Sequence, residues 1–430
     1  MSTLRSVFQL QTIIFLIPIV FLFSRSAADV IACLISVVFL CHCIKTNNWG
    51  WIYKPWVIVA LSLWLFTVLV VSPLAINSLT SIKIAFPLIR FIIFAVAFAY
   101  WILKEPRFQK AFERGVVLVV VFIIIDSIYQ YFYGEDILGY TQLGNGRLTG
   151  PFPDQVPGTY VARFIFIALA ALFFSTKFKS IRTKVIVVIV GIGITTEFLV
   201  LTGERAAFLN FMLGSFLILI ALFYKFPTTR VLLLTGLALS AIGTTVLALS
   251  NPIMKRRTID SSIEYIVHWP ESDNGKIVSS AVEIMINHGN YLTGIGIRNY
   301  RSEISKNKSL LKKYRISAPN ATHPHNIYVE WLVETGIFGL LGFALMIFFI
   351  MKDCLKPFLN EKRLMVSTFA IATLLTTFWP LSHGMSFFTN RHAAIIWITV
   401  AWALAFTRRN TLTSSDVNSQ PDSHNEQNVT

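Results

Sequence analysis

The amino-acid sequence predicts an all-α, polytopic membrane protein with about twelve transmembrane helices and a loop subdomain on the outer side of the membrane. Of its 430 residues, 55% are hydrophobic and only 14% are charged, whereas about a quarter of the residues of a soluble protein are charged. Apolar stretches that approach the length needed to cross a bilayer, about 20 residues, recur along the chain. These observations together indicate a multi-pass membrane protein.

Twelve apolar stretches are candidate spans, and the first two are joined by little more than Arg25. No small-residue cleavage site follows the first stretch, so we expect a retained helix rather than a cleaved signal. The approximate bounds of the stretches are 10–24, 27–44, 52–72, 80–103, 115–133, 158–175, 184–201, 206–224, 231–250, 326–350, 364–381 and 392–407.

The distribution of basic residues predicts that both termini are cytoplasmic. Eighteen lysines and arginines fall in the short connections on the side of the N-terminus. The short connections on the other side hold only five, which are Arg25, Lys83, Arg147, Arg205 and Arg391. Because short loops rich in Lys and Arg stay in the cytoplasm, we expect the second set of connections to face outward.

The candidate spans divide the chain into four parts. Residues 1–250 hold spans one to nine, 251–325 form a large outer loop, 326–409 hold spans ten to twelve, and 410–430 form a tail. The outer loop is too small and polar to hold a core of its own, so we expect it to pack on the membrane bundle. Within it, the pattern predicts a helix from Lys276 to Asn287. The polar tail is expected to be disordered and cytoplasmic.

The net charge of +15 lies mostly in the loops. It favours membrane lipids with anionic head groups, or phosphate-bearing substrates, as partners. Nucleic acid is not an expected partner, because the chain has no soluble basic domain. The four cysteines lie in or beside apolar segments, which favours packing over a disulfide framework or a metal site.

His325 is the candidate proton acceptor. It lies in the segment 322–326, which closes the large outer loop and precedes an apolar helix. Pro324 stiffens the approach and Asn326 can cap the helix, so a neutral imidazole held here could take a proton from a sugar hydroxyl. A helix cap or an interfacial polar residue is the alternative role. His323 could be a second metal ligand, but no third ligand follows nearby, so zinc is a minor alternative.

Three arginines of the outer connections are candidate phosphate ligands. Arg205, in Thr-Gly-Glu-Arg at 202–205, carries a permanent charge and planar donors that match diphosphate oxygens. Snorkelling to lipid phosphate is its alternative role. Arg147 lies among glycines of the outer loop 134–157, where backbone can approach a ligand. Arg298 follows a Gly-x-Gly segment. A solvated basic loop is the alternative for Arg147 and Arg298.

Ionisable residues inside predicted spans are costly and call for partners. Asp126 is expected to neutralise Arg90, and ion pairing is also the favoured role for Arg163. A proton or ion pathway is the alternative. Glu330 and Glu334 lie one turn apart on the helix after His325, where one of them could orient a histidine or bind a sugar hydroxyl.

In these motifs the chain resembles the O-antigen ligase and polymerase superfamily of bacterial envelope glycosyltransferases. The similarity covers most of the chain: twelve spans, a large outer loop between the ninth and tenth, and a His-Asn helix start. That start leads to Glu-Thr-Gly-Ile-Phe-Gly-Leu at 334–340. The Thr-Gly-x-Arg turn at 202–205 and Arg-x-Thr-Gly at 147–150 also look like family motifs.

The resemblance implies a glycosyltransferase-C-like fold in the bacterial inner membrane, with an active site that faces the periplasm. Members move a glycan from an undecaprenyl-diphosphate carrier to an acceptor hydroxyl without a nucleotide sugar, metal or other cofactor. By this analogy His325 is the general base and Arg205 binds the diphosphate. The family usually has another arginine near the start of the outer-loop helix. Here that position looks like Lys276, which lacks the bidentate fork, so Arg298 is the alternative second contact.

The favoured function is ligation of carrier-linked O-antigen to lipid A-core. A polymerase that extends the repeat unit and a protein O-oligosaccharyltransferase are alternatives within the same class. A polysaccharide transporter or flippase is the alternative from a different class, and it would need mid-membrane charge and internal repeats. Asp126 and Arg90 agree with the first requirement, but the two halves show no repeat. A non-enzymatic scaffold would not explain the arginines on one face.

Overall fold

The structure is a computed structural model. It describes residues 2–142, 146–249, 267–317, 322–356, 363–380 and 386–416, with side chains given from residue 8 to 408 of these ranges. The described chain is helical apart from its connections, in which Glu135 and Thr141 form an isolated antiparallel β-bridge. The expectation of an all-α protein is therefore confirmed for the described residues.

Every one of the twelve predicted spans coincides with a helix or with a set of consecutive helices. In chain order these are α1 (Ser2–Phe23), α2 (Arg25–Thr46), α3 (Pro55–Phe66) with η1 (Thr67–Val71) and α4 (Ser72–Leu74), α5 (Ser78–Ala85) with η2 (Phe86–Leu88), α6 (Ile89–Ala97) and η3 (Phe98–Ile102), α7 (Pro106–Tyr133), α8 (Pro157–Phe173), α9 (Ile181–Thr202), α10 (Arg205–Lys225), η4 (Pro227–Thr229) with α11 (Arg230–Leu249), α17 (Ile327–Leu355), α18 (Leu364–Phe378) and α19 (Asn390–Asp416).

Among the described residues, eight helices or continuous helical segments are long and apolar enough to cross a membrane, which supports a multi-pass membrane protein. Three further apolar helices are shorter, at Phe8–Phe23, Pro157–Phe173 and Leu364–Phe378. The number of twelve transmembrane helices therefore stays a prediction. The last helix, α19, continues past the expected end at residue 407 as far as Asp416, and residues 417–430 of the expected tail lie outside the described chain.

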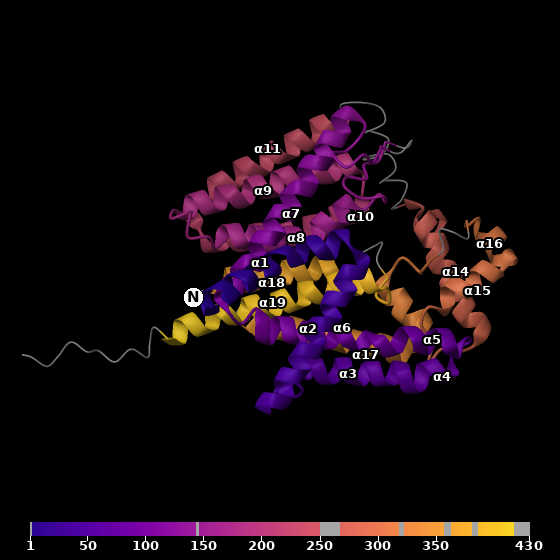
Figure 1. The fold of residues 1–430 in the computed structure, drawn as a ribbon. Helices are drawn as coiled ribbons and strands as arrows, with labels where there is room; N and C mark the ends of the chain where they lie inside the picture. The colour runs from indigo at the N-terminus through magenta and orange to yellow at the C-terminus, as the bar shows by residue number, and fades with distance from the viewer. Residues whose placement is uncertain are drawn as a thin grey trace, which may run out of the picture.

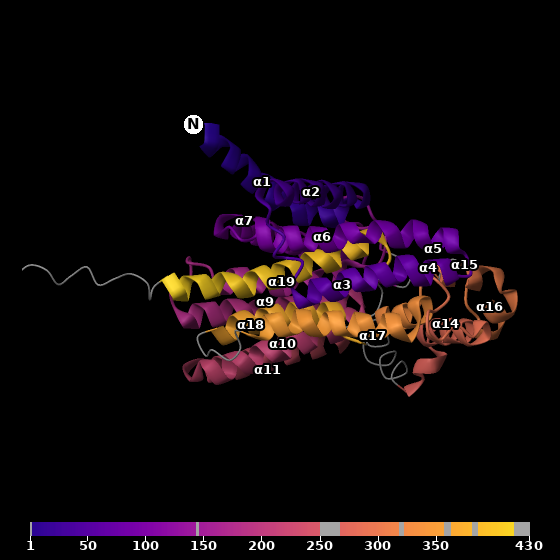
Figure 2. The ribbon, with the colours of Figure 1, turned by 90° about the horizontal axis from the view of Figure 1, so that it is seen from below.

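The helices run side by side in a bundle with two distinct ends. The N-terminus and the C-terminal end of α19 lie at one end, and α14 (Asp273–His288), α15 (Asn299–Lys306) and α16 (Lys308–Tyr314) lie at the other (Figure 1, Figure 2). For brevity we call the second the loop end. This arrangement agrees with the expectation that both termini share one side of a membrane.

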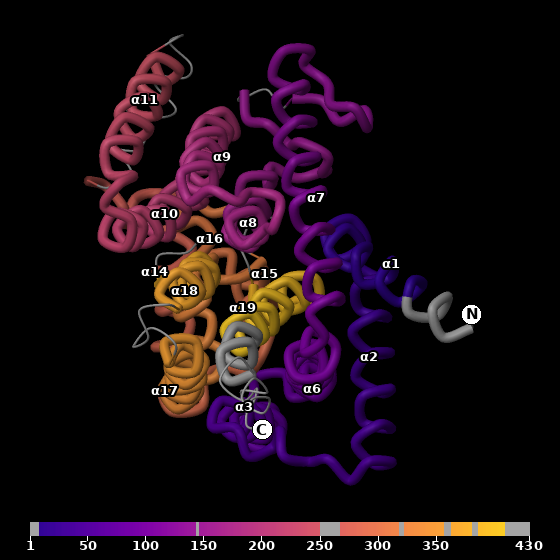
Figure 3. Tube along the Cα trace, turned by 90° about the vertical axis from the view of Figure 1, so that its left-hand side faces the viewer, coloured from indigo at the N-terminus to yellow at the C-terminus, as the bar shows by residue number. Residues whose placement is uncertain are grey.

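Two helices occupy the centre of the bundle. Viewed along its axis, α19 lies between α6, α17 and α18 (Figure 3), and it also packs on α2. Every residue of α19 from 393 to 407 is buried, and α8 is buried from residue 160 to 170. Helices that are apolar around their whole circumference belong in such a place. The charged residues near the loop ends of α8 and α19 therefore lie close to the middle of the molecule.

The predicted helix of the outer loop is confirmed as α14. It buries Ile277, Ala281, Ile284 and Met285 on one face, as the pattern indicated. That face packs against Tyr300, Ile304 and Leu310 of α15 and α16 and against Val333 of α17. The expectation that the loop packs on the bundle is therefore confirmed for its described part, because its small core includes residues of α17.

The helix α17 is interrupted at Gly336, whose φ of 69° and ψ of −172° are not helical. Two carbonyls before the break turn outward, so Val333 O accepts from Ile295 N at 2.9 Å and Glu334 O accepts from Gly296 N at 3.0 Å. Past the break, Ile337 N donates to Tyr291 O at 2.9 Å. Hydrogen bonds therefore hold the segment 291–297 against α17, and Arg298 directly follows this segment.

Replacing Gly336 with alanine should destabilise the protein by about 3 kcal/mol or more. An added Cβ would come 2.2 Å from Leu292 O and 2.5 Å from Thr293 N, and the backbone of this residue is left-handed. Thermal unfolding in detergent measures the loss. Gly193→Ala is the control, because the nearest atom to its Cβ is Ser240 Oγ at 4.0 Å. Equal unfolding temperatures for the two variants would contradict the prediction.

Candidate functional site

Glu204 fixes the turn that carries Arg205. Its buried carboxylate accepts hydrogen bonds from Gly158 N at 2.6 Å, Thr159 N at 2.9 Å and Thr159 Oγ1 at 2.5 Å. These backbone donors belong to the first turn of α8, where N–H groups have no partner within the helix and where negative charge is favourable. Glu204 is also the residue directly before α10. One carboxylate therefore ties the start of α10 to the start of α8.

Arg147 lies in a loop that is anchored on α7. Gln130 Oε1 accepts from Thr149 N at 2.9 Å and from Gly150 N at 3.0 Å, and Gln130 Nε2 donates to Thr149 Oγ1 at 2.7 Å. Gly150 has a φ of +53°, and a Cβ there would come 2.5 Å from Ser127 Oγ. Gln130 thus fixes the end of the segment 147–150 against the last turns of α7.

Arg147, Glu204 and Arg205 lie close enough to one another for their charges to interact. Burial lowers the pKa of the Arg147 guanidinium, Glu204 raises it, and Arg205 lowers it further. Burial raises the pKa of Glu204, while the bonds from Thr159 and Gly158 and the charge of Arg147 lower it. Arg205 itself is exposed. The two predicted phosphate ligands Arg147 and Arg205 are therefore brought together at the loop end.

Replacing Glu204 with glutamine should destabilise the protein by about 2 kcal/mol, because an amide NH₂ group would then face a backbone N–H of α8. Thermal unfolding in detergent is the measurement. Glu197→Gln is the matched control, since Glu197 accepts from a single hydroxyl, Thr244 Oγ1 at 3.0 Å, and an amide can still accept that bond. A larger loss for Glu197→Gln than for Glu204→Gln would contradict this role of Glu204.

His325 directly precedes the cap of α17 and has a left-handed backbone with a φ of 55°. Asn326 Oδ1 accepts from Tyr328 N at 2.9 Å and Val329 N at 3.1 Å, which confirms it as the predicted helix cap. Asn326 Nδ2 donates to Pro380 O at 2.7 Å. The rings of His323 and His325 lie 4.2 Å apart between centroids. This geometry holds the His325 imidazole against a second ring at the start of α17.

Two buried carboxylates of α17 organise the neighbouring segments. Glu330 accepts from Ser386 Oγ at 2.5 Å and from Phe387 N at 2.7 Å, so it holds the segment that leads into α19. Glu334 accepts from Arg298 N at 2.7 Å. The positive charge of Arg298 acts on both carboxylates. Glu330 thus links α17, the helix that follows His325, to the segment before α19.

Lys276 lies in the first turn of α14 and is partly buried. Its backbone N–H donates to Ser272 O at 2.9 Å, but its ammonium group makes no hydrogen bond or ion pair with another described residue, unlike Arg298, whose charge acts on Glu330 and Glu334. Arg205 begins α10, Lys276 lies in α14 and His325 precedes α17. Their convergence in one cavity therefore remains a prediction.

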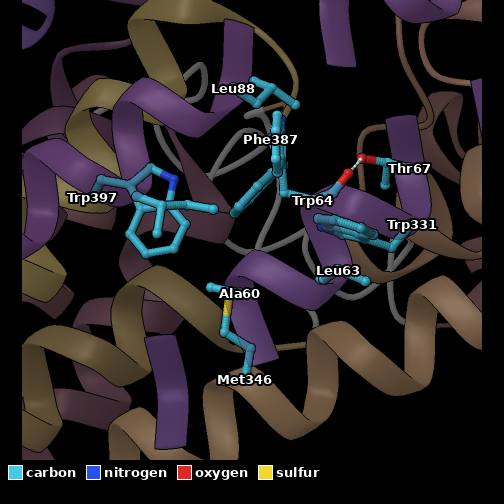
Figure 4. Close-up of a pocket in the computed structure, with 10 residues that line it drawn as sticks. Ala60, Leu63, Trp64, Thr67, Leu88, Trp331, Met346, Phe387 and Trp397 are labelled. Carbon is cyan, nitrogen blue, oxygen red and sulfur yellow. Dashed lines mark hydrogen bonds between the residues drawn. The ribbon is translucent and has the colours of Figure 1, made fainter. Parts of the chain in front are cut away.

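An apolar cavity lies beside the first turns of α17. It is lined by residues of α3, η1, η2, α6, α17, α19 and the segment before α19, with Trp331, Trp397 and Phe387 around it (Figure 4). Thr67, the only hydroxyl among its lining residues, donates to Trp64 O at 2.8 Å. Trp331 directly follows Glu330, and Phe387 N donates to Glu330. An apolar ligand chain in this cavity would lie next to Glu330 of α17, the helix that follows His325.

The predicted pairing of Arg90 with Asp126 is wrong. Arg90 pairs with Asp29 of α2, at 2.8 Å between Nη2 and Oδ1. Asp126 is fully buried in α7 and accepts from Ile137 N at 3.0 Å, so it holds the start of the outer loop instead. Arg163 was also expected to be paired, but no carboxylate of the described chain forms an ion pair with it.

Sequence reasoning did not assign functional roles to Glu204, Gln130, Arg391 and His392. The position of Glu204 directly before Arg205 was visible, but its partners lie in a different helix, 45 and 46 residues earlier. Arg391 entered the sequence argument only as one of five outer basic residues. Its place over the rings of Tyr160 and Phe152, at 4.9 and 5.8 Å, depends on helix packing.

Among the described residues, no group of three or more His, Cys, Asp or Glu side chains is placed to hold a metal ion. Comparison with protein families finds that residues 190–344 match a family model described as O-antigen ligase, which confirms the resemblance inferred from the motifs. The matched region contains Arg205, Lys276, Arg298 and His325, whereas Arg147 lies before it. No curated protein sequence matches the chain.

Proposed function

Because residues 190–344 match a family model described as O-antigen ligase, we propose that this chain joins a glycan from an undecaprenyl-diphosphate carrier to an acceptor hydroxyl. The acceptor is lipid A-core, and the reaction takes place at the periplasmic face of the bacterial inner membrane. The observation that carries this proposal is the match to the family over the segment that holds Arg205 and His325, together with the meeting of Arg147 and Arg205 at Glu204.

In the proposed reaction, His325 takes the proton of the acceptor hydroxyl as its oxygen bonds to the anomeric carbon of the glycan. The bond between that carbon and the diphosphate oxygen breaks, and the anomeric configuration inverts. Negative charge then grows on the diphosphate, where Arg205, Arg147 and Lys276 stabilise it. Diphosphate is already a good leaving group, so a base and fixed positive charge suffice. Neither a metal nor a cofactor is needed in this scheme.

The remaining predicted residues act by support. Asn326 caps the helix after His325, Glu330 holds the segment that leads into α19, and His323 packs on the His325 ring. Because the charge of Arg298 faces Glu330 and Glu334, we assign the second diphosphate contact to Lys276 rather than to Arg298. The apolar cavity beside Trp331 offers a surface for part of the carrier chain.

An assay with purified protein tests the proposal. Carrier-linked glycan is incubated either with purified lipid A-core or with carrier-linked repeat units alone. Transfer to lipid A-core supports the ligase, whereas lengthening of the carrier-linked chain without lipid A-core would make the protein a polymerase. If a His325→Ala variant kept full transfer while an Asp126→Asn variant abolished export, the protein would be a transporter instead.

A further inference from the structure

A second group of cations lies at the loop ends of the two central helices, separate from the cluster of Arg147, Glu204 and Arg205. Arg163 of α8 is only 4% exposed, its Nη1 has no hydrogen-bond partner, and no carboxylate of the described chain pairs with it. An unpaired guanidinium in an apolar bundle is costly, so such residues mark binding sites more often than structural positions.

Arg391 approaches the same part of α8 from the start of α19. Its guanidinium lies over the ring of Tyr160, 4.9 Å from the centroid, and donates to Leu22 O, while its Nε has no partner. Tyr160 and Arg163 are three residues apart on α8, so they lie on one face of that helix. The two guanidinium groups therefore flank a common stretch of α8.

His392 connects this pair to the rest of the loop end. Its Nδ1 lies 3.0 Å from Thr389 Oγ1. The charges of Arg163, Arg391, Arg25 and Arg298 all act on it, with Arg163 the strongest. The imidazole of His392 therefore lies in the positive field of the arginines at this end of the bundle.

The carboxylates of this region have their ion-pair or hydrogen-bond partners elsewhere, although the charge of Asp154 also acts on Arg391. Asp154 pairs with the exposed Arg25, at 3.7 Å. Glu330 and Glu334 face Arg298. Neither Arg163 nor Arg391 forms an ion pair in the part of the chain that the structure describes. Together with the imidazole of His392 they form a group in which the buried Arg163 has no counter-charge among the described residues.

We propose that Arg163, Arg391 and His392 form a phosphate-binding subsite, distinct from the one at Arg205. Guanidinium groups match phosphoryl oxygens in geometry and charge. Arg391 and His392 are partly exposed, whereas Arg163 is buried. The phosphate belongs either to the carrier diphosphate or to a phosphorylated acceptor lipid. This choice of sources rests on the proposed function, but the subsite itself does not.

Thermal unfolding of the full-length protein in detergent tests the subsite, with farnesyl diphosphate and bisphosphorylated lipid A as probes. We compare Arg163→Met, Arg391→Gln, Arg205→Ala and the control Arg408→Gln. Arg408 is also partly buried on α19, lies over the ring of Tyr100 and donates to Ala99 O, but its position is about 25 Å along the helix from Arg391.

Without a probe, Arg163→Met should unfold at the same temperature as the natural protein or higher, because the substitution removes an unpaired buried charge. The affinity of Arg163→Met for the probe should be at least tenfold lower than that of the natural protein. Arg391→Gln should weaken binding of the same probe, whereas Arg408→Gln should not. Arg205→Ala should keep a measurable probe-induced shift in unfolding temperature. If Arg163→Met and Arg391→Gln lose the increase in unfolding temperature caused by farnesyl diphosphate, the subsite binds the carrier. If they lose the increase caused by lipid A, it binds the acceptor.

Two results would overturn the inference. Arg163→Met could unfold well below the natural protein without a probe, which would make Arg163 a structural residue. Alternatively, Arg163→Met and Arg391→Gln could keep both shifts while Arg205→Ala loses them, which would leave the proposed function standing and remove only the second subsite. If the natural protein transfers no glycan but Arg163→Met and Arg391→Gln still lose a probe shift, the proposed function fails and the subsite stands.

Discussion

A His325→Ala variant should transfer glycan about a hundredfold more slowly than the natural protein, or worse, because general-base catalysis contributes about 10² to 10⁴ in rate. The loss should appear in kcat, since the imidazole acts on the hydroxyl proton as the new bond forms. Initial rates with carrier-linked glycan and lipid A-core measure it.

The controls separate this role from a loss of structure. His288 ends α14, lies 3.6 Å from Glu303 and belongs to the same loop-end subdomain, so His288→Ala should keep transfer close to normal. Asn326→Ala should lower the thermal stability of the protein, because it removes the cap of α17. If His325→Ala retained full transfer in folded protein, His325 would be excluded from the mechanism.

The helices could be predicted because a bilayer demands long apolar segments, and each predicted span coincides with a helix. The helix α14 could be predicted from the spacing of Ile277, Ala281 and Ile284, which a helix places on one face. The capping role of Asn326 followed from local chemistry alone. Features that depend on near neighbours in the chain were therefore accessible to sequence reasoning.

Pairings between helices were not accessible in this way. Arg90 pairs with Asp29, 61 residues away, and nothing in the sequence around Asp126 excluded it as the partner. Glu204 stabilises a helix start 46 residues before it. The break at Gly336 followed from no pattern, because the stretch is as apolar as an unbroken span. Its cause is the segment 291–297, which bonds to the carbonyls that the break releases. Which residues meet depends on how the helices pack.

The same limit applies to the candidate site. The motifs around Arg205 and His325 identified chemical groups, and the structure adds the neighbours of each group. It brings Arg147 to Arg205 through Glu204, and it places Arg298 against Glu330 and Glu334. Arg391 entered the sequence analysis only as an outer basic residue and His392 did not enter it, and the contact of Arg391 with Tyr160 of α8 gives them a role in the phosphate-binding subsite.

Replacing Arg205 with alanine should lower transfer by at least about a hundredfold, because a fixed donor to the growing negative charge contributes about 10² to 10³ in rate. The side chain of Arg205 is exposed, so its truncation leaves no cavity in the core. We therefore expect normal thermal stability in this variant. Arg205→Lys should recover part of the rate, since lysine keeps the charge but not the two parallel donors.

Arg205 and its neighbour Glu204 provide an internal comparison. Glu204 is buried and bonded to α8, so Glu204→Gln should change stability, whereas Arg205→Ala should change the rate in protein of normal stability. Arg230→Ala, at the start of α11 near the opposite end of the bundle, is the matched arginine control and should transfer normally. Full transfer by folded Arg205→Ala would show that the leaving diphosphate is stabilised elsewhere, and Arg163 and Arg391 would then be the first residues to test.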